Sequence, residues 1–301
     1  HVMVTTSATL ALHIVLWILL EPGDEVIAYE PFYNFYDPMI RSAGGVPRYV
    51  KLSPPEWPVI EADLRKTVTP KTKLLILNSP MNPNGKVFSR EELDIIARVA
   101  QDHNLIVICD EVYEFLTNPD HPHIPLATLP GMSERVIRIS SPGKTFSFTG
   151  WRVGYLSAPE EFIPALTKAH TLTTFCVPIP LQMAVAKGLQ DQNFIARQGD
   201  IMKEKADYLA AGLSKIGFDP LPYQGGFFLC ADYRDVAHKI GFEGNSLELT
   251  EYLTKNAGIT PMPLDAFYED GQEKNTLLRF CVAKKHSTLA SAIKALEKTG
   301  V

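Results

Sequence analysis

Three short segments of the sequence combine reactive side chains with residues that are typical of functional loops. The first runs from Ser141 to Arg152 and places Lys144 among small and aromatic neighbours. A lysine with little charge around it loses part of its hydration, which favours the neutral amine and hence imine chemistry with an aldehyde or ketone. Ser141 and Arg152 flank it and have the donors to hold a phosphate. Taken alone, a serine-rich lysine loop is more often a solvated turn.

The second segment, Asp110-Glu111-Val112-Tyr113, directly follows the apolar run 105–109. An aspartate at the end of an apolar strand must be paired or hydrogen-bonded. One suitable partner is a protonated heterocyclic nitrogen, because a carboxylate keeps such a nitrogen charged. Tyr113 can then donate to a phenolic oxygen of the same ring. The simpler interpretation of Asp110 is a cap of the next helix or a bond to loop amides.

The third segment is the loop Asn78 to Gly85, in which two prolines and a glycine hold the amides of Asn78 and Asn82 at fixed positions. A separate turn, Ser7-Ala8-Thr9, lies where a strand passes into a helix, and its free N–H groups suit phosphate. Neither signal is specific alone, because most Asn-Pro-Asn-Gly stretches are turns and most strand-to-helix connections have such groups.

Isolated residues add weaker indications. Tyr33, which follows Pro31-Phe32, can stack on a flat ring, although an aromatic residue there more often fills the core. Arg279 lies inside the apolar run 277–282, so its guanidinium needs either a bound carboxylate or a structural acidic partner. The eight histidines show no metal-ligand spacing, and His121 and His123 belong to a proline-rich stretch that we expect to be solvated. We predict no metal site.

The elements that position these residues alternate between strands and helices. Strands are expected at 2–6, 25–30, 46–52, 74–78, 105–109 and 136–139, and helices at 8–20, at 33–43 and from Ser89, where Glu92 completes a capping box. This alternation predicts an α/β fold, a mostly parallel sheet sandwiched by helices. Ligands of such sheets bind beyond the carboxyl ends of the strands, where the three segments lie. After residue 190 the pattern changes, which predicts domains 1–194 and 195–301, the second a smaller α+β unit.

Composition limits the classes of function. The 301 residues carry a net charge of −5, which argues against a broad nucleic-acid or anionic-membrane footprint. The longest apolar stretch, 8–20, is too short to span a membrane and lacks the flanks of a signal peptide. The four cysteines are widely separated, which predicts a reducing, cytoplasmic compartment, with an organelle also open.

In chain order these features resemble the fold-type I, pyridoxal-phosphate-dependent aminotransferases of classes I and II, over essentially the whole chain. The resemblance implies that Lys144 forms the aldimine with pyridoxal 5'-phosphate and that Asp110 pairs with the pyridine nitrogen. It further implies a homodimer, with an amino acid and a 2-oxo acid as substrates. The other implied roles are ring-oxygen contact for Tyr113 and Asn82, ring stacking for Tyr33, phosphate binding for Ser7, Ala8, Thr9, Ser141 and Arg152, and substrate-carboxylate binding for Arg279, with Asn78 and Asn82 close by.

Within that family the sequence looks most like kynurenine, glutamine and methionine transaminases. The phrases that carry this likeness are 30–33, 41–48, 143–147 and 265–268. The chain departs from relatives at Ser7, where glycine is usual, and from kynurenine-preferring enzymes at Thr9 and Cys176, so kynurenine is a less favoured donor. The family's N-terminal arm has no counterpart before His1, so we expect residues 1–194 to lack it.

The sequence therefore predicts a transaminase with a ping-pong reaction on an amino acid of the kynurenine, glutamine, methionine or aromatic type. A near alternative is β-elimination from cysteine conjugates at the same site. A more distant one is a regulatory module that binds pyridoxal phosphate without turnover. An unrelated nucleotide-binding protein is disfavoured, because the sequence has neither a G-x-G-x-x-G nor a Walker A pattern.

Overall fold

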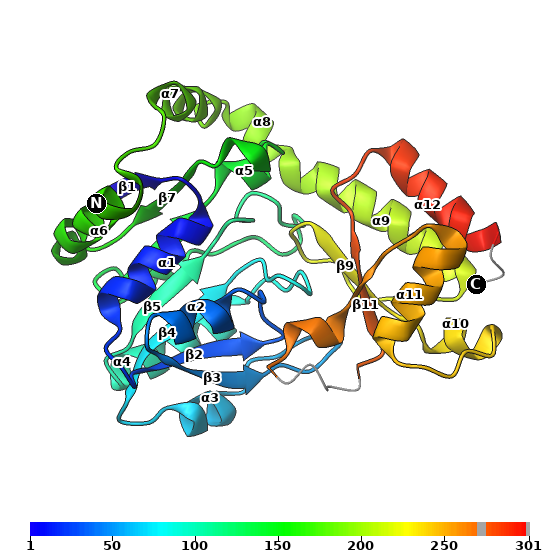
Figure 1. Cartoon of the computed structure of the whole chain (residues 1–301), viewed down its shortest axis with the longest axis horizontal. Helices are drawn as coiled ribbons and strands as arrows, with labels where there is room; N and C mark the ends of the chain where they lie inside the picture. Colours follow the sequence, from blue (N-terminus) through cyan, green and yellow to red (C-terminus); the bar gives the residue numbers. More distant parts are fainter. Residues whose placement is uncertain (270–274, 299–301) are drawn as a thin grey trace.

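The computed structural model of the chain describes residues 1–269 and 275–298, which form two sheets with separate sets of helices. Figure 1 shows the larger sheet in the blue-to-green part of the chain and the smaller sheet in the yellow-to-red part. Seven strands build the larger sheet, in the order β1-β7-β6-β5-β4-β2-β3. They are β1 (Val2–Thr5), β2 (Glu25–Glu30), β3 (Val46–Lys51), β4 (Thr72–Asn78), β5 (Ile106–Asp110), β6 (Val136–Ser140) and β7 (Gly154–Ser157).

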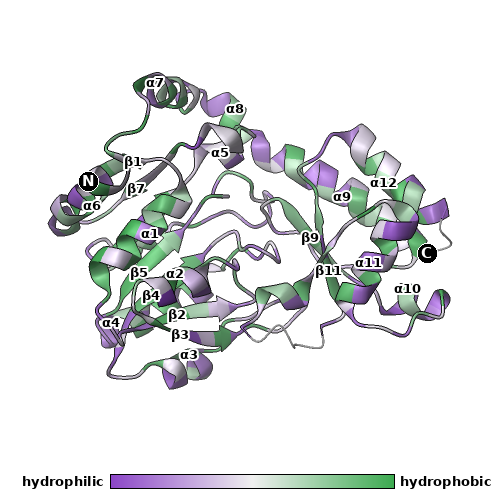
Figure 2. Cartoon of the chain, in the orientation of Figure 1, coloured by the Kyte–Doolittle hydropathy of each residue, from purple (hydrophilic) through white to green (hydrophobic). Residues whose placement is uncertain are grey.

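The larger sheet is mostly parallel, as predicted. Strands β3, β2, β4, β5 and β6 pair in parallel, whereas β7 is antiparallel to both β6 and β1. Helices α1 (Ala8–Leu19), α2 (Tyr36–Ser42) and α6 (Ile163–Thr174) cover one face, and α3 (Glu61–Thr67) and α4 (Arg90–Asp102) cover the other. Because both faces are buried, residues 74–77 of β4 and 106–109 of β5 form continuous apolar runs rather than an alternating pattern, as Figure 2 shows for these two strands.

Local sequence signals account for several helix boundaries. The capping box at the start of α4 forms as predicted, with the Ser89 hydroxyl accepting from Glu92 N and a Glu92 carboxylate oxygen accepting from Ser89 N. Helix α2 begins at Tyr36, three residues later than predicted. The preceding residues form a turn instead, in which Tyr36 N donates to Tyr33 O at 2.8 Å.

The remaining helices that accompany the larger sheet are α5 (Pro142–Thr145), α7 (Ile179–Gly188) and α8 (Gln192–Ala196).

The smaller sheet is antiparallel, in the order β10-β11-β9-β8. Its strands are β8 (Asp219–Pro220), β9 (Phe228–Asp232), β10 (Met262–Pro263) and β11 (Leu277–Cys281), packed against α9 (Gln198–Ile216), α10 (Arg234–Lys239), α11 (Ser246–Ala257) and α12 (His286–Lys298). Within the described residues, no helix is long and apolar enough to cross a membrane.

Strand register brings the predicted chemical segments together at one edge of the larger sheet. Asn78 at the end of β4 pairs with Asp110 at the end of β5, and Asp110 pairs in turn with Ile139 of β6. The chain leaves β6 directly into Ser141 and the short helix that carries Lys144. Residues that are more than thirty positions apart in the sequence therefore become neighbours.

Candidate active site

A cavity of about 220 Å³ opens at the carboxyl edge of the larger sheet, and we call it the carboxyl-edge cavity. It brings together all the predicted site residues except Arg279. Three further residues line it that the sequence did not single out: Leu12, Val112 and Thr149. The predicted residues in its wall are Ser7, Ala8, Thr9, Tyr33, Asn78, Asn82, Asp110, Tyr113, Ser141, Lys144 and Arg152.

Asp110 lies at the buried end of the carboxyl-edge cavity. One of its oxygens, Oδ2, accepts a 2.6 Å hydrogen bond from the Tyr36 hydroxyl, and Oδ1 accepts a longer bond, 3.4 Å, from Val112 N. Burial raises the pKa of the Asp110 carboxyl, while the Tyr36 hydrogen bond opposes that rise by favouring the charged form. The carboxylate is thus held by fixed donors and directed toward the cavity.

Tyr36 is a functional candidate that sequence reasoning missed. Its side chain is 2% exposed, and burial raises its pKa well above the usual tyrosine value, so the hydroxyl keeps its proton and donates. It lies 74 positions before Asp110, and the sequence between them gives no sign of the contact. The only sequence signal is its place in the helix that follows Tyr33, one face of which must pack on the sheet.

Lys144 reaches the carboxyl-edge cavity from the four-residue helix α5. Its Nζ lies 5.5 Å from the ring centroid of Tyr113 and 5.5 Å from that of Phe227, a residue just before β9. Burial lowers the pKa of the Lys144 amine, and attraction to Asp110 opposes this shift. The predicted desolvation of this lysine is therefore present, and a neutral amine is an effective nucleophile and base.

The turn between β1 and α1 forms one wall at the open end of the cavity. Ser7 caps α1, accepting a 3.1 Å hydrogen bond from Leu10 N, which leaves the N–H groups of Ala8 and Thr9 at the first turn of a twelve-residue helix. Gly154 of β7 packs against this turn so closely that an added Cβ would lie 2.4 Å from Ala8 N. Only glycine at 154 lets the turn approach the sheet.

Ser141 and Arg152 complete the open end. Arg152 has a left-handed backbone, with φ 54° and ψ 47°, which is uncommon for a residue other than glycine and concentrates at functional sites. Its guanidinium donates to Thr149 O at 2.9 Å and remains exposed, and the Ser141 hydroxyl donates to Val153 O at 3.3 Å. Both side chains keep further hydrogen-bonding capacity for an anion.

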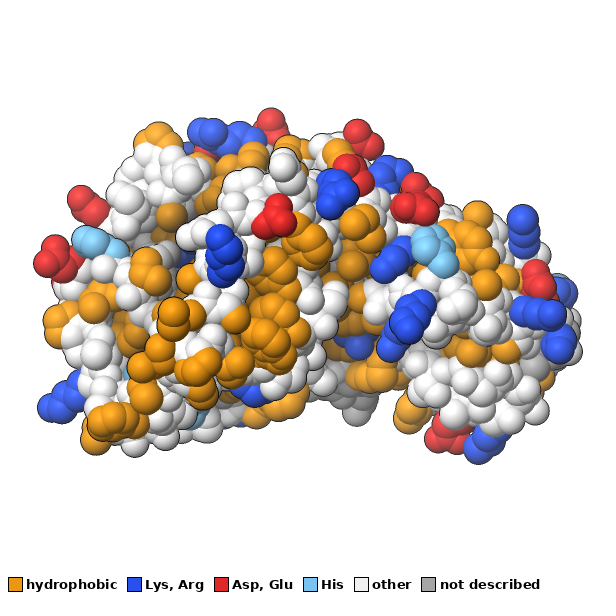
Figure 3. Space-filling model, turned by 90° about the horizontal axis from the view of Figure 1, so that it is seen from above, with side chains coloured by type: hydrophobic (Ala, Val, Ile, Leu, Met, Phe, Trp, Pro, Cys, Tyr) orange, Lys and Arg blue, Asp and Glu red, His pale blue; other side chains and the backbone are white. Residues whose placement is uncertain are grey.

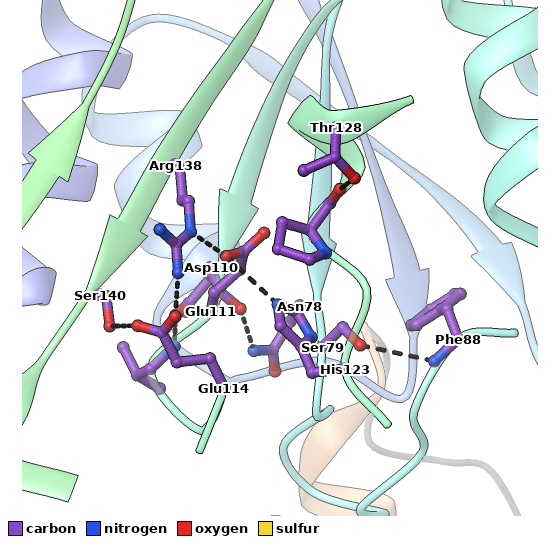
Figure 4. Close-up of polar contacts among 12 residues, drawn as sticks. Asn78, Ser79, Phe88, Asp110, Glu111, Glu114, His123, Thr128, Arg138 and Ser140 are labelled. Carbon is purple, nitrogen blue, oxygen red and sulfur yellow. Dashed lines mark hydrogen bonds and ion pairs between the residues drawn. The ribbon is translucent and has the colours of Figure 1, made fainter. Parts of the chain in front are cut away.

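Two asparagines connect the loop after β4 to its neighbours. Asn78 Nδ2 donates to Asp110 O at 2.8 Å, as Figure 4 shows, and Asn78 Oδ1 accepts from Asn82 N at 2.7 Å. Asn82 Oδ1 accepts a 2.7 Å hydrogen bond from Arg279 Nη1. Because arginine only donates, this bond fixes the orientation of the Asn82 amide and leaves its Nδ2 free to donate.

Arg279 comes from β11 of the smaller sheet and joins the site through Asn82. Its Cζ lies 3.8 Å from the Phe228 ring centroid and 4.6 Å from that of Phe267, so the guanidinium is held between two aromatic faces. Within residues 1–269 and 275–298, no carboxylate forms an ion pair with it. The structural acidic partner considered from the sequence is therefore not seen among these residues, which leaves the guanidinium available for a ligand carboxylate.

Comparison with known proteins identifies the family to which this arrangement belongs. The sequence matches aminotransferase class I and II over residues 1–296. The chain belongs to this family. It is a pyridoxal-phosphate-dependent transaminase of the fold-type I architecture, which confirms the predicted enzyme class, cofactor and fold. Its substrates are accordingly an amino acid and a 2-oxo acid.

Similar proteins act on several amino acids. Kynurenine–oxoglutarate transaminase 1 of Homo sapiens is 34% identical, over 99% of this chain and 77% of the human protein. The structure of N-succinyldiaminopimelate aminotransferase from Mycobacterium tuberculosis has a TM-score of 0.94 at 38% identity and covers 99% of this chain and 77% of its own. An Escherichia coli protein with a methionine aminotransferase function has a TM-score of 0.93 at 33% identity, over 99% of this chain and 76% of its own.

The lining of the carboxyl-edge cavity fits pyridoxal phosphate in each of its parts. A helix N-terminus with nearby hydroxyl and guanidinium donors suits the phosphate dianion. The Lys144 amine, whose pKa is lowered by burial, suits the aldehyde. The Asp110 carboxylate, which accepts a hydrogen bond from the Tyr36 hydroxyl, suits a protonated ring nitrogen. The chemistry of this donor set therefore agrees with the cofactor of the family.

Proposed function

We propose that Lys144 and Asp110 are the catalytic pair of this transaminase and that the carboxyl-edge cavity binds the cofactor between them. One observation carries this proposal: the desolvated amine of Lys144 and the fixed carboxylate of Asp110 line the same cavity. The phosphate-binding role goes to Ser7, Ala8, Thr9, Ser141 and Arg152 at the open end. Tyr33, Tyr113 and Asn82 contact the ring and its oxygen.

The proposed roles follow from the charge and reach of each side chain. Arg279, together with Asn78 and Asn82, binds and orients the substrate carboxylate, which directs the bond from Cα to its hydrogen toward Lys144. Lys144 Nζ, as the neutral amine, takes the proton from Cα and later returns a proton. Asp110 holds a proton on the ring nitrogen. When bound, pyridoxal phosphate supplies the electron sink that makes removal of the Cα proton feasible.

Asn82 and Tyr113 supply hydrogen bonds to the ring oxygen in this proposal. The Asn82 amide is oriented by Arg279, so its Nδ2 is a donor on the cavity side. Tyr113 is 3% exposed, and burial raises its pKa, so its hydroxyl remains protonated and donates. A residue that binds substrate, Arg279, thereby also positions a residue that binds the cofactor.

For the amino donor we propose a side chain of the methionine, glutamine, aromatic or kynurenine type. Support comes from the Phe227 ring, whose centroid lies 5.5 Å from Lys144 Nζ, and from the apolar side chains of Leu12 and Val112 in the cavity wall. Names of similar proteins include kynurenine, methionine and N-succinyldiaminopimelate transaminases.

A panel of donors tests the proposal. The loaded enzyme is mixed with kynurenine, glutamine, methionine, phenylalanine or a cysteine conjugate, and conversion of the cofactor to its amino form is followed by absorbance. Conversion by at least one of these donors, and its loss in Lys144→Ala, is the expected result. No conversion by any donor would contradict the proposed substrate class. Pyruvate and ammonia released from a cysteine conjugate without a 2-oxo acid would indicate β-elimination at the same site.

The domain division 1–194 and 195–301 is also proposed. Its boundary falls inside α8, after which the long helix α9 begins the part that surrounds the smaller sheet. The two parts share buried contacts, since Tyr113 packs in the core of the smaller sheet and Phe267 in that of the larger. Limited proteolysis is expected to cut first near residue 195, and a first cut inside either sheet would contradict this division.

We propose a homodimer on the basis of an exposed apolar area on α6 and α7. Four apolar side chains of the α6–α7 region are largely exposed. They are Leu172, Phe175, Ile179 and Met183, with exposures of 72%, 76%, 66% and 68%. Figure 3, which looks onto the side of the molecule that carries α7, shows hydrophobic side chains gathered there.

Solution mass tests the proposed dimer. Light scattering is expected to give twice the chain mass for the wild type and a shift toward the chain mass for Ile179→Asp, because a charge is costly in an apolar interface. Leu247→Asp is the control, since Leu247 is a 56% exposed leucine of α11 outside this area. A wild-type mass equal to one chain, or the same mass for both variants, would contradict the proposal.

A cytoplasmic location is proposed from the cysteines. All four are free thiols, and Cys109 and Cys230 are buried away from any oxidant. Burial raises the pKa of the Cys230 thiol to about 12 and that of Cys109 as well, which makes both unreactive. Cell fractionation tests the location, and recovery of the protein outside the cytoplasm would contradict it.

A further inference from the structure

Next to the cavity residues Asp110 and Tyr113 lies a cluster of one arginine, which is 27% exposed, and two buried glutamates that none of the proposed roles uses. Glu111 and Glu114 belong to the same segment as Asp110 and Tyr113, but their side chains are only 2% and 5% exposed. Arg138 of β6 contacts both, with Nε at Glu111 Oε2 and Nη2 at Glu114 Oε2, as Figure 4 shows. We call this set the Arg138 cluster.

Further contacts join the Arg138 cluster to β7 and to the loop that contains His123. Ser140 Oγ donates to Glu114 Oε1 at 2.6 Å, and the Tyr155 hydroxyl of β7 donates to the same oxygen at 3.1 Å. His123 Nε2 lies 3.2 Å from Glu111 Oε2, and the His123 side chain is only 7% exposed, so the predicted solvated loop is wrong at this residue. The proline-rich sequence around His123 gave no sign of that burial.

The position of the Arg138 cluster is informative, because it connects the segments that carry the cavity residues. Asp110 and Tyr113 line the cavity, whereas Glu111 and Glu114 anchor the same segment to Arg138. From Arg138 the chain continues through Ser140 to Lys144, and Tyr155 lies three residues after Arg152. The cluster therefore fixes the ends of β5, β6 and β7 relative to one another.

Stability alone does not explain such a cluster. Two buried carboxylates share one guanidinium, and burying charged groups of this kind often contributes no more stability than apolar side chains would. The sheet is already held by backbone bonds at this point, since Glu111 N donates to Ile139 O at 2.8 Å. What the cluster adds is a fixed geometry, because Arg138 contacts each carboxylate through a different nitrogen of its planar guanidinium.

We propose that Arg138 is a positioning residue of the transaminase: by holding Glu111 and Glu114, it sets the placement of Asp110 and Tyr113 relative to Lys144. This inference rests on the proposed roles of Lys144 and Asp110. A misplacement of about 1 Å between reacting groups can reduce a rate about 100-fold. Loss of Arg138 is therefore expected to lower kcat strongly and to change the electronic surroundings of the bound cofactor.

The test compares Arg138→Met and Arg138→Lys with the wild type and with a control, Arg48→Met. Arg48 is a suitable match, because it lies on β3 of the same sheet and its Nη2 pairs at 2.6 Å with Glu25, whose side chain is 4% exposed. Four quantities are measured for each protein: kcat, KM for the amino donor, the pH midpoint of the absorbance of the bound cofactor, and thermal unfolding. Arg138→Lys keeps a charge, so a measurement remains if Arg138→Met does not fold.

We expect kcat to fall about 10-fold to 100-fold in the Arg138 variants, KM to stay within about 2-fold, and the absorbance midpoint to shift. Arg48→Met is expected to lose stability while keeping wild-type kcat and midpoint. If the Arg138 variants lose stability but keep wild-type kcat and midpoint, Arg138 is merely structural and the inference fails. A wild type that carries no cofactor on Lys144 would instead overturn the proposed function, so the two failures are distinguishable.

Discussion

The two ends of the carboxyl-edge cavity differ in how they hold a ligand. At the inner end, Tyr36 and Tyr113 are 2% and 3% exposed, and the Asp110 carboxylate accepts hydrogen bonds from the Tyr36 hydroxyl and from Val112 N. At the outer end, Arg152 is exposed, and the donors come from a helix N-terminus and short side chains. The residues at the inner end, to which we assign the ring, are thus mostly buried, whereas Arg152 at the outer end, to which we assign the phosphate, is exposed.

This difference separates control of chemistry from control of affinity. In the buried surroundings of Asp110 each charge acts strongly, so a single hydrogen bond from Tyr36 opposes the rise in the carboxyl pKa that burial causes. At the outer end the exposed charge of Arg152 is screened by solvent, and several hydrogen-bond donors together bind an anion. Substitutions at the inner end should therefore change kcat, whereas those at the outer end should change the affinity for the cofactor.

The largest effect is expected for Lys144→Ala. The substitution removes both the nucleophile and the base, so kcat should fall by about 10,000-fold or more, at the upper limit of what general base catalysis provides. Steady-state transamination with the best donor of the panel measures it. Lys255→Ala, at a lysine 73% exposed on α11, is the control and should retain full activity. Substantial activity in Lys144→Ala would contradict the assignment of Lys144 as the catalytic lysine.

Asp110→Asn is expected to have the next largest effect. An amide cannot hold a proton on the ring nitrogen by charge, so kcat should fall about 1,000-fold, as for the loss of a preorganised electrostatic group. Cofactor binding should weaken far less, because the phosphate end is intact. A titration of the apo form followed by fluorescence, together with kcat, separates the two quantities. Equal losses in both would show that the ends are not functionally distinct.

Tyr36→Phe sharpens the comparison at the inner end. The variant loses a hydrogen bond to a charged group, about 1.5 kcal/mol or more, so kcat should fall about 10-fold. Tyr49→Phe is a matched control, because the Tyr49 hydroxyl also donates to an aspartate, Asp37, at 2.6 Å but lies outside the cavity. Similar kinetics in the two variants would remove Tyr36 from the functional residues.

Arg152→Gln addresses the outer end. We expect the dissociation constant of pyridoxal phosphate to rise about 10-fold, because one charged donor is lost while the helix N-terminus and Ser141 remain. At saturating cofactor, kcat should stay within about 2-fold of the wild-type value. Equilibrium dialysis measures the affinity, with Arg90→Gln as an exposed surface control. A large loss of kcat at saturation would contradict the division between the two ends.

The smallest effect concerns the protonation of Lys144 in the apo protein. Burial lowers the pKa of its amine, so the neutral form should be present at a lower pH than for an ordinary lysine. Competitive acetylation at a series of pH values, with peptide mass spectrometry, should give a labelling midpoint below that of free lysine. A midpoint at or above the free lysine value would mean that Asp110 outweighs the burial.

The sequence predicted much of the larger sheet and most of the cavity wall. The run 105–109 is apolar because both faces of β5 are covered, and the polar residues that follow β5 and β6 lie at one edge. Strand register, which follows from such runs, then brings Asn78 beside Asp110. These parts depend on local pattern, and local pattern is what a sequence displays directly.

The parts that the sequence did not predict are long-range contacts of polar side chains. The Tyr36 hydroxyl reaches Asp110, and Arg138 reaches two glutamates in the turn after β5, with no local signal for either contact. The burial of His123 is a similar case, since its proline-rich surroundings resemble a solvated loop. Each of these depends on how elements pack on one another, which propensity and periodicity do not specify.

The most direct test of the central claim is reduction of the loaded enzyme with borohydride, followed by peptide mass spectrometry. If Lys144 binds the cofactor in the carboxyl-edge cavity, one peptide containing Lys144 will carry the mass of the reduced cofactor, and Lys144→Ala will carry none. Attachment at any other lysine, or the same mass recovered from Lys144→Ala, would contradict the account.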